Sequence, residues 1–134
     1  MDKQINPKLL ALKRAIIDGM VSCMKFGGAD DENDEDYDPD FDAGYKQSDV
    51  NKCDKALTDF LLKLAKADGK KNKDWIIETT KSTVFKLNKI NAECDCCLIE
   101  TDQREDICQL VQLATQQAGL VTKQTDITEE WREW

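Results

Sequence analysis

Residues 48–67 read SDVNKCDKALTDFLLKLAKA, and their apolar side chains recur every three or four positions, which is the spacing of one face of an α-helix. That face holds Val50, Cys53, Leu57, Phe60, Leu61 and Leu64. Lysines and aspartates occupy the opposite side, and Ser48 is placed to cap the first turn. A helix of this kind buries its apolar side and leaves its charged side in water, so the stretch predicts an amphipathic core helix.

Two neighbouring stretches also have helical spacing. Residues 7–26 follow Asn6, a favourable N-cap, and begin with Pro7, whose missing amide hydrogen is not needed at the first helical position. Residues 73–91 keep an apolar helical face despite several threonines, although Phe85 falls on the opposite side. Phe85 therefore contacts another element, belongs to a binding surface, or indicates that this stretch is not a helix; contact with another element is the favoured alternative.

A fourth helix is predicted after a cluster of three cysteines. Thr101 or Asp102 can cap this helix, and Glu105 completes a capping-box pattern with Asp102. Gly119 is placed as its left-handed stop, with Leu120 packing back against the last turn.

The chain ends in DITEEWREW, where Thr128 can cap a short helix that brings Ile127, Trp131 and Trp134 onto one face. Burying each tryptophan stabilises the fold by roughly 2–4 kcal/mol, so we expect this tail to be docked. The predicted fold is therefore all-α, with four main helices plus a short C-terminal helix around one core. Residues 1–134 are expected to form a single helical domain.

Residues 27–47 have neither helical nor strand periodicity and are predicted to form a long acidic loop between the first two helices. Within them, residues 30–42 read DDENDEDYDPDFD and hold nine of the 27 acidic residues. The rest of the chain has 18 acidic residues against 19 lysines and arginines, so this acidic segment accounts for the net charge of −8. Charge is thus concentrated in a part of the chain that the helical core does not need.

The acidic segment predicts a protein partner with a basic surface. Its carboxylates can steer such a partner over a distance, and three aromatic residues spaced four apart can anchor it on contact. The candidate partner-binding residues are Asp30, Asp31, Glu32, Asp34, Glu35, Asp36, Tyr37, Asp38, Asp40, Phe41, Asp42 and Tyr45. Nucleic acid is disfavoured as a partner, because the acidic field repels phosphates and the sequence has no basic cluster that contains aromatic residues.

A divalent-cation module, with calcium as the ion, is the first alternative, because calcium takes oxygen ligands. The spacing does not match an EF-hand loop: counted from Asp31, Asp36 stands at the glycine position and Asp42 where glutamate is expected. The leading prediction therefore has no metal site and no cofactor.

An uncharacterised enzyme is the second alternative. The sequence has no histidine, which removes the usual general base and the commonest metal ligand. Cys94 and Cys97 have Cys-x-x-Cys spacing, but a second ligand pair for zinc is missing. We therefore predict a non-catalytic protein without catalytic residues.

No signal peptide and no apolar run of about 20 residues is evident, which favours a cytoplasmic protein without a membrane interaction. In that compartment the six cysteines are expected to be free thiols.

Two runs of the C-terminal third, KLNKINAECDCCLIETDQREDICQLVQLATQQAGL and DITEEWREW, resemble a small bacterial helical domain family of unknown function. The motifs that carry the resemblance are IETDQRE and the terminal Trp-x-x-Trp pattern. The resemblance implies a bacterial helical domain without assigned chemistry. An immunity or antitoxin role follows only by analogy of size and charge.

Overall fold

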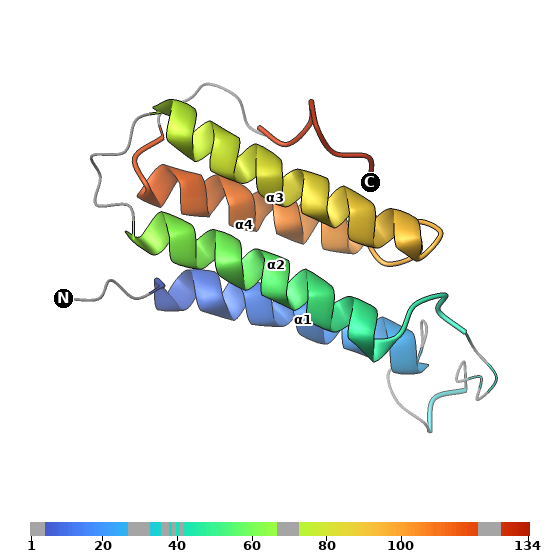
Figure 1. Cartoon of the computed structure of the whole chain (residues 1–134). Helices are drawn as coiled ribbons and strands as arrows, with labels where there is room; N and C mark the ends of the chain where they lie inside the picture. The colour runs from blue at the N-terminus through green and yellow to red at the C-terminus, as the bar shows by residue number, and fades with distance from the viewer. Residues whose placement is uncertain are drawn as a thin grey trace.

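In this computed structural model, the described part of the chain contains four α-helices (Figure 1). The structure describes residues 5–26, 33–35, 38, 40, 42–66, 73–120 and 127–134. The helices are α1 (Pro7–Phe26), α2 (Gln47–Lys66), α3 (Lys73–Glu93) and α4 (Thr101–Gln117). No strand occurs among these residues, so the predicted all-α class is confirmed. None of the helices in this part of the chain has the length and apolar character needed to cross a membrane.

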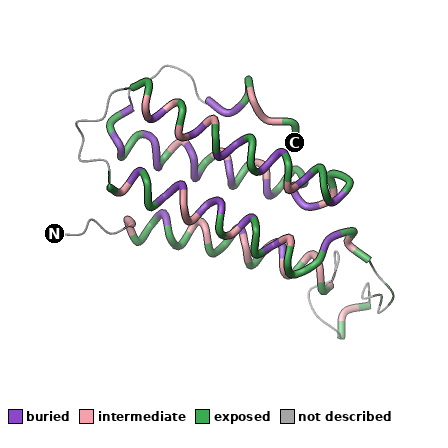
Figure 2. The backbone as a smooth tube through the Cα atoms, in the orientation of Figure 1, coloured by how far each residue is buried: buried purple, intermediate pink, exposed green. Residues whose placement is uncertain are grey.

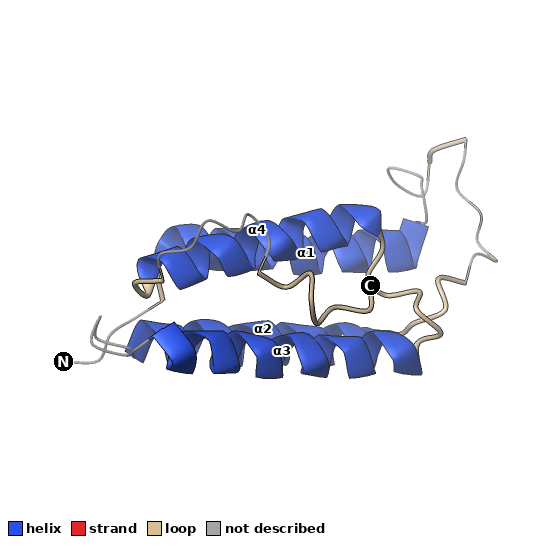
Figure 3. Cartoon of the chain, turned by 90° about the horizontal axis from the view of Figure 1, so that it is seen from above, coloured by secondary structure: helices blue, strands red, loops and turns tan. Residues whose placement is uncertain are grey.

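The helices lie in two layers, with α1 beside α4 in one and α2 beside α3 in the other (Figure 3). Consecutive helices run in opposite directions (Figure 1), and α2 also packs against α1 across the layers. This arrangement is an up-and-down four-helix bundle. α1 ends and α2 begins at the end of the bundle where α3 gives way to α4 (Figure 1).

The core consists of the inward sides of the four helices (Figure 2), and α2 contributes the largest share of it. The whole stripe predicted from residues 48–67 is buried, and Ala56 joins it. On α1, Leu9, Ile16 and Met20 are buried and Leu10 is exposed; four further apolar residues are partly buried against the core, namely Leu12, Ile17, Val21 and Met24. A helix at the corner of a bundle has two packed neighbours and keeps the rest of its circumference in water.

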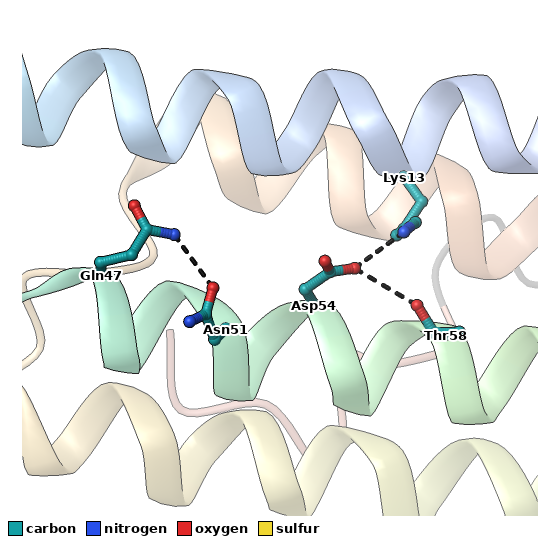
Figure 4. Close-up of polar contacts among 5 residues, drawn as sticks. All are labelled: Lys13, Gln47, Asn51, Asp54 and Thr58. Atoms are coloured by element: carbon teal, nitrogen blue, oxygen red, sulfur yellow. Dashed lines mark hydrogen bonds and ion pairs between the residues drawn. The ribbon is translucent and has the colours of Figure 1, made fainter.

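An ion pair between α1 and α2 connects the two layers (Figure 4). Lys13 Nζ of α1 lies 2.8 Å from Asp54 Oδ1 of α2. The hydroxyl of Thr58 donates a hydrogen bond to the same oxygen at 3.2 Å. Such a partly exposed pair contributes about 0–1 kcal/mol, so it helps to set the register of α1 on α2 while apolar burial supplies most of the stability.

The predicted cap of α1 is confirmed, because the Lys8 amide donates to Asn6 Oδ1 at 2.8 Å. The start of α2 differs from the prediction of a Ser48 cap. Asp49 Oδ2 accepts a hydrogen bond from the Lys46 amide at 2.9 Å, and the helix begins at Gln47, two residues before the start that a Ser48 cap would give. A carboxylate at the third helical position reaches back to the capping residue in the same way in a capping box.

The start of α4 is a further correction. Glu100 is its N-cap residue and makes no side-chain capping bond, and the Arg104 amide donates to the Glu100 carbonyl at 2.8 Å. Thr101 and Asp102 therefore lie inside the first turn, where a side chain can no longer serve as the cap.

The end of α4 is as predicted. Gly119 has a φ of +107°, which is strained for a residue with a Cβ atom. Its amide donates to the Gln116 carbonyl, and the Leu120 amide donates to the Thr115 carbonyl at 2.9 Å. This pair of bonds is a Schellman motif, and Leu120 is buried as the motif favours.

The turn between α3 and α4 is built on a buried asparagine. The carbonyl of Asn91 accepts the Cys96 amide at 2.8 Å, and its side-chain oxygen accepts the Ile99 amide at 2.9 Å. The chain turns through Asp95 and Cys96, whose φ values are 53° and 64°. The cysteine run predicted to follow the third helix is therefore a tight left-handed turn.

The C-terminal segment is docked as predicted, but the short helix predicted to begin at Thr128 is wrong. Residues 127–131 form a single turn, in which the Trp131 and Arg132 amides both donate to the Thr128 carbonyl. The next amide in reach, that of Glu133, donates to Asn88 Oδ1 at 3.0 Å. A helical ladder cannot continue through an amide that is bonded to another helix.

Asn88 binds the tail through both polar atoms of its side-chain amide. Its Oδ1 accepts the Glu133 amide, and its Nδ2 donates to the Trp131 carbonyl at 2.8 Å. We expect Asn88→Ala to lower the free energy of unfolding by about 1–3 kcal/mol, since two partly buried hydrogen bonds are lost. Urea unfolding followed by circular dichroism measures this change.

Lys89→Ala changes the exposed neighbour on the same helix and is the matched control, with an expected effect within about 0.5 kcal/mol. Equal stabilities for the two variants would contradict the role assigned to Asn88.

Candidate functional site

The described part of the acidic segment lies beyond the end of the bundle (Figure 1). Glu35, Asp38, Asp40 and Asp42 are exposed, and Asp34 is half-buried. The other predicted partner-binding positions of this segment, Asp30, Asp31, Glu32, Asp36, Tyr37 and Phe41, lie outside the described residues.

Two of these carboxylates accept hydrogen bonds from backbone amides two residues further along the chain. Asp38 Oδ1 accepts the Asp40 amide at 2.9 Å, and Asp42 Oδ1 accepts the Gly44 amide at 2.9 Å. Within the described ranges, no ion pair engages Glu35, Asp38, Asp40 or Asp42. Their negative charge is therefore presented to solvent.

The segment returns to the bundle through a close contact with the cysteine turn. Gly44 has a φ of +85°, and a Cβ atom at this position would lie 3.0 Å from Cys97 Sγ. A side chain here would meet both backbone strain and a tight contact. Gly44 thus fixes where the acidic segment ends and where the α3–α4 turn lies against it.

Tyr45 anchors this return in the core. It is 7% exposed, and its hydroxyl donates a hydrogen bond to the Met20 carbonyl at 2.6 Å. Burial raises the pKa of the Tyr45 phenol well above its usual value, with smaller contributions from Cys23 and Glu100. The prediction that Tyr45 contacts a partner is therefore corrected: a residue this buried has no surface left for one.

The three clustered cysteines have different surroundings. Cys94 is buried, Cys97 is half-buried and Cys96 is exposed. Burial, followed by the nearby Asp49 carboxylate, raises the pKa of the Cys94 thiol to about 11. A protonated, buried thiol is a poor nucleophile, so Cys94 is suited to packing.

Elsewhere, burial raises the pKa of the Cys53 thiol to about 12. In the part of the chain that the structure describes, no group of three or more cysteine or carboxylate side chains is arranged to hold a metal ion. None of the six cysteines, all of which the structure describes, forms a disulfide.

A shallow pocket of about 410 Å³ opens where α4 begins. Its lining combines two thiols, two carboxylates and one guanidinium with the C-terminal tryptophan, and includes Cys23, Cys96, Glu100, Asp102, Arg104 and Trp134. Trp134 Nε1 is buried here without an acceptor among the described groups. Sequence reasoning missed this pocket because its lining comes from α1, the α3–α4 turn, α4 and the tail.

Lysines of α2 and α3 line two adjoining surface grooves, which share Lys86 and Lys89. Phe85 is 49% exposed beside them, and the Lys81 ammonium lies 5.7 Å from the centre of its ring. The prediction that no basic cluster contains aromatic residues is therefore corrected. Residues 81–89 of α3 hold Lys81, Phe85, Lys86 and Lys89, and Lys52 and Lys55 of α2 extend this cluster. We call the surface formed by both grooves the lysine face.

Comparisons with protein-family models, with curated proteins and with solved structures return no match to this chain. The family resemblance of the C-terminal third therefore stays a prediction.

We expect Tyr45→Phe to lower the free energy of unfolding by about 0.5–1.5 kcal/mol, because the ring stays buried while the hydrogen bond to Met20 is lost. Urea unfolding at neutral pH tests this.

Tyr45→Ala should cost more, about 3–5 kcal/mol, since it also removes the buried ring. Unchanged stability in both variants would show that Tyr45 is not part of the core.

We expect iodoacetamide at about pH 8 to modify exposed Cys96 before buried Cys94 and Cys53, as mass spectrometry of digested protein reports. With a pKa near 11, only about one Cys94 thiol in a thousand is ionised at that pH.

In concentrated urea the six thiols should react at similar rates, which controls for intrinsic reactivity. Labelling of Cys94 as fast as Cys96 in the folded protein would contradict the burial of Cys94.

Proposed function

We propose that the protein is a non-catalytic binding domain that engages a protein partner with a basic surface through the acidic segment, residues 30–42. One observation carries this proposal: the exposed carboxylates of Glu35, Asp38, Asp40 and Asp42 have no cationic partner among the described residues. Side chains that leave their charge unpaired at one end of a domain attract basic surfaces over roughly a Debye length, about 8 Å at physiological salt.

The anchoring of Gly44 and Tyr45 also supports the proposal. Both residues tie the C-terminal end of the acidic segment to the bundle, and Asp42, whose Oδ1 accepts the Gly44 amide, is held next to this anchor. Because Tyr45 is buried, the aromatic anchors of the proposed interface are reduced to Tyr37 and Phe41.

The absence of catalysis is part of the same proposal, and the high pKa of the buried Cys94 thiol supports it. A cytoplasmic location is also proposed, on the sequence alone. A regulatory, immunity or antitoxin role is compatible with a small acidic binding domain by analogy only.

The test uses one variant in which four carboxylates of the acidic segment are replaced by amides: Glu35→Gln, Asp38→Asn, Asp40→Asn and Asp42→Asn. Asparagine keeps the oxygen that accepts the amides of Asp40 and Gly44, so the local fold is preserved while the charge is removed. We expect immobilised wild-type protein to recover basic proteins from native lysate at about 0.1 M salt but not at about 1 M, where the Debye length is about 3 Å. The variant should not recover these basic proteins at either salt concentration.

The matched control neutralises four exposed carboxylates elsewhere, Glu105, Asp106, Glu129 and Glu130, which changes the net charge equally. Recovery of the same proteins by the acidic-segment variant, with the same salt dependence, would exclude this segment as the interface.

A further inference from the structure

The lysine face consists of charged side chains from two helices on one side of the bundle. The groove between α2 and α3 has a volume of about 440 Å³, and the groove along α3 about 520 Å³. Together they are lined by five lysines, Lys52, Lys55, Lys81, Lys86 and Lys89, against three carboxylates, Asp59, Glu78 and Glu93.

Three of these lysines are available to an incoming anion. Lys52 pairs with Glu93 at 3.4 Å, and Lys81 lies over the ring of Phe85. Lys55, Lys86 and Lys89 are exposed, and no ion pair holds them among the described residues. The lysine face therefore offers unpaired positive charge on a grooved surface.

The lysine face also offers apolar contact. Phe85 lies in the groove along α3, and Ala56 and Ile90 line the groove between the helices. An occupant that matches this surface presents several carboxylates together with one or two aromatic side chains. The acidic segment of this chain has that composition, with nine carboxylates, Tyr37 and Phe41.

We propose that the basic partner is a second copy of this chain, and that the acidic segment of one copy docks on the lysine face of the other. This inference rests on the proposed function and names its partner. The net charge of −8 on each copy opposes approach, but at physiological salt charges beyond about 8 Å are largely screened. Complementary charges in contact then outweigh the repulsion between whole molecules.

The expected association is weak. One segment on a shallow surface buries less than the roughly 1,200 Å² that stable complexes bury. Two copies that exchange segments reciprocally would form a closed dimer, whereas a one-way contact would form open chains.

Sedimentation equilibrium at about 0.1 M salt tests the proposal, over protein concentrations from about 10 μM to about 1 mM. We expect the average mass to rise above that of the monomer with concentration, and to return to it at about 1 M salt. The double variant Lys86→Glu/Lys89→Glu should stay monomeric, as should the variant with the neutralised acidic segment. Lys63→Glu/Lys66→Glu, which changes two exposed lysines of α2 outside the lysine face, should associate as the wild type does.

Mixing gives the decisive outcome. The Lys86→Glu/Lys89→Glu variant keeps an intact acidic segment, and the variant with the neutralised acidic segment keeps an intact lysine face. A mixture of the two should therefore associate, although neither variant associates alone. A monomeric wild type, an equal loss in the Lys63/Lys66 control, or a mixture that stays monomeric would overturn the proposal. Self-association can fail while salt-sensitive recovery of basic proteins persists, in which case the proposed function stands and only this partner is excluded.

Discussion

The burial of the apolar side of α2 is the constraint on which the rest of the structure depends. This helix packs against α1 and α3, and its seven buried residues include Leu57, Phe60 and Leu61. Each large side chain of this kind stabilises the fold by roughly 1.5–3 kcal/mol when buried, so rotation of α2 about its axis is not tolerated. The orientation of α2 that buries these residues also places Lys52 and Lys55 next to α3. The α2 part of the lysine face is therefore a consequence of core packing.

The acidic segment depends on the bundle in a different way. None of its described carboxylates belongs to the buried core, yet this segment connects α1 to α2. Two residues anchor the chain where it rejoins the bundle. The Tyr45 side chain enters the core, and Gly44, which has no side chain, leaves room for Cys97. Charge repulsion within the acidic segment can then be relieved in solvent without disturbing the helices.

The sequence predicted the helices well, because their apolar spacing is local information: α1 has its predicted bounds, and Gly119 ends α4 as expected. It failed where a partner comes from another part of the chain. Asn88 interrupts the predicted C-terminal helix by taking the amide of Glu133, and Tyr45 is buried because α1 supplies an acceptor. The lysine face was only in part beyond prediction. Lys81, Phe85 and Lys89 lie on one helix at local spacings, whereas Lys52 and Lys55 become their neighbours only when α2 and α3 pack.

The three carboxylates within the lysine face bear on which anions can occupy it. A nucleic-acid backbone carries negative charge at every step, so it would meet Asp59, Glu78 and Glu93 as well as the lysines. A peptide can place its carboxylates beside Lys55, Lys86 and Lys89 and its aromatic side chains near Phe85, which leaves the acidic positions uncontacted. Specificity of this kind comes from repulsion as much as from attraction. The mixed charge of the lysine face therefore favours an acidic peptide that contains aromatic residues over a uniform polyanion.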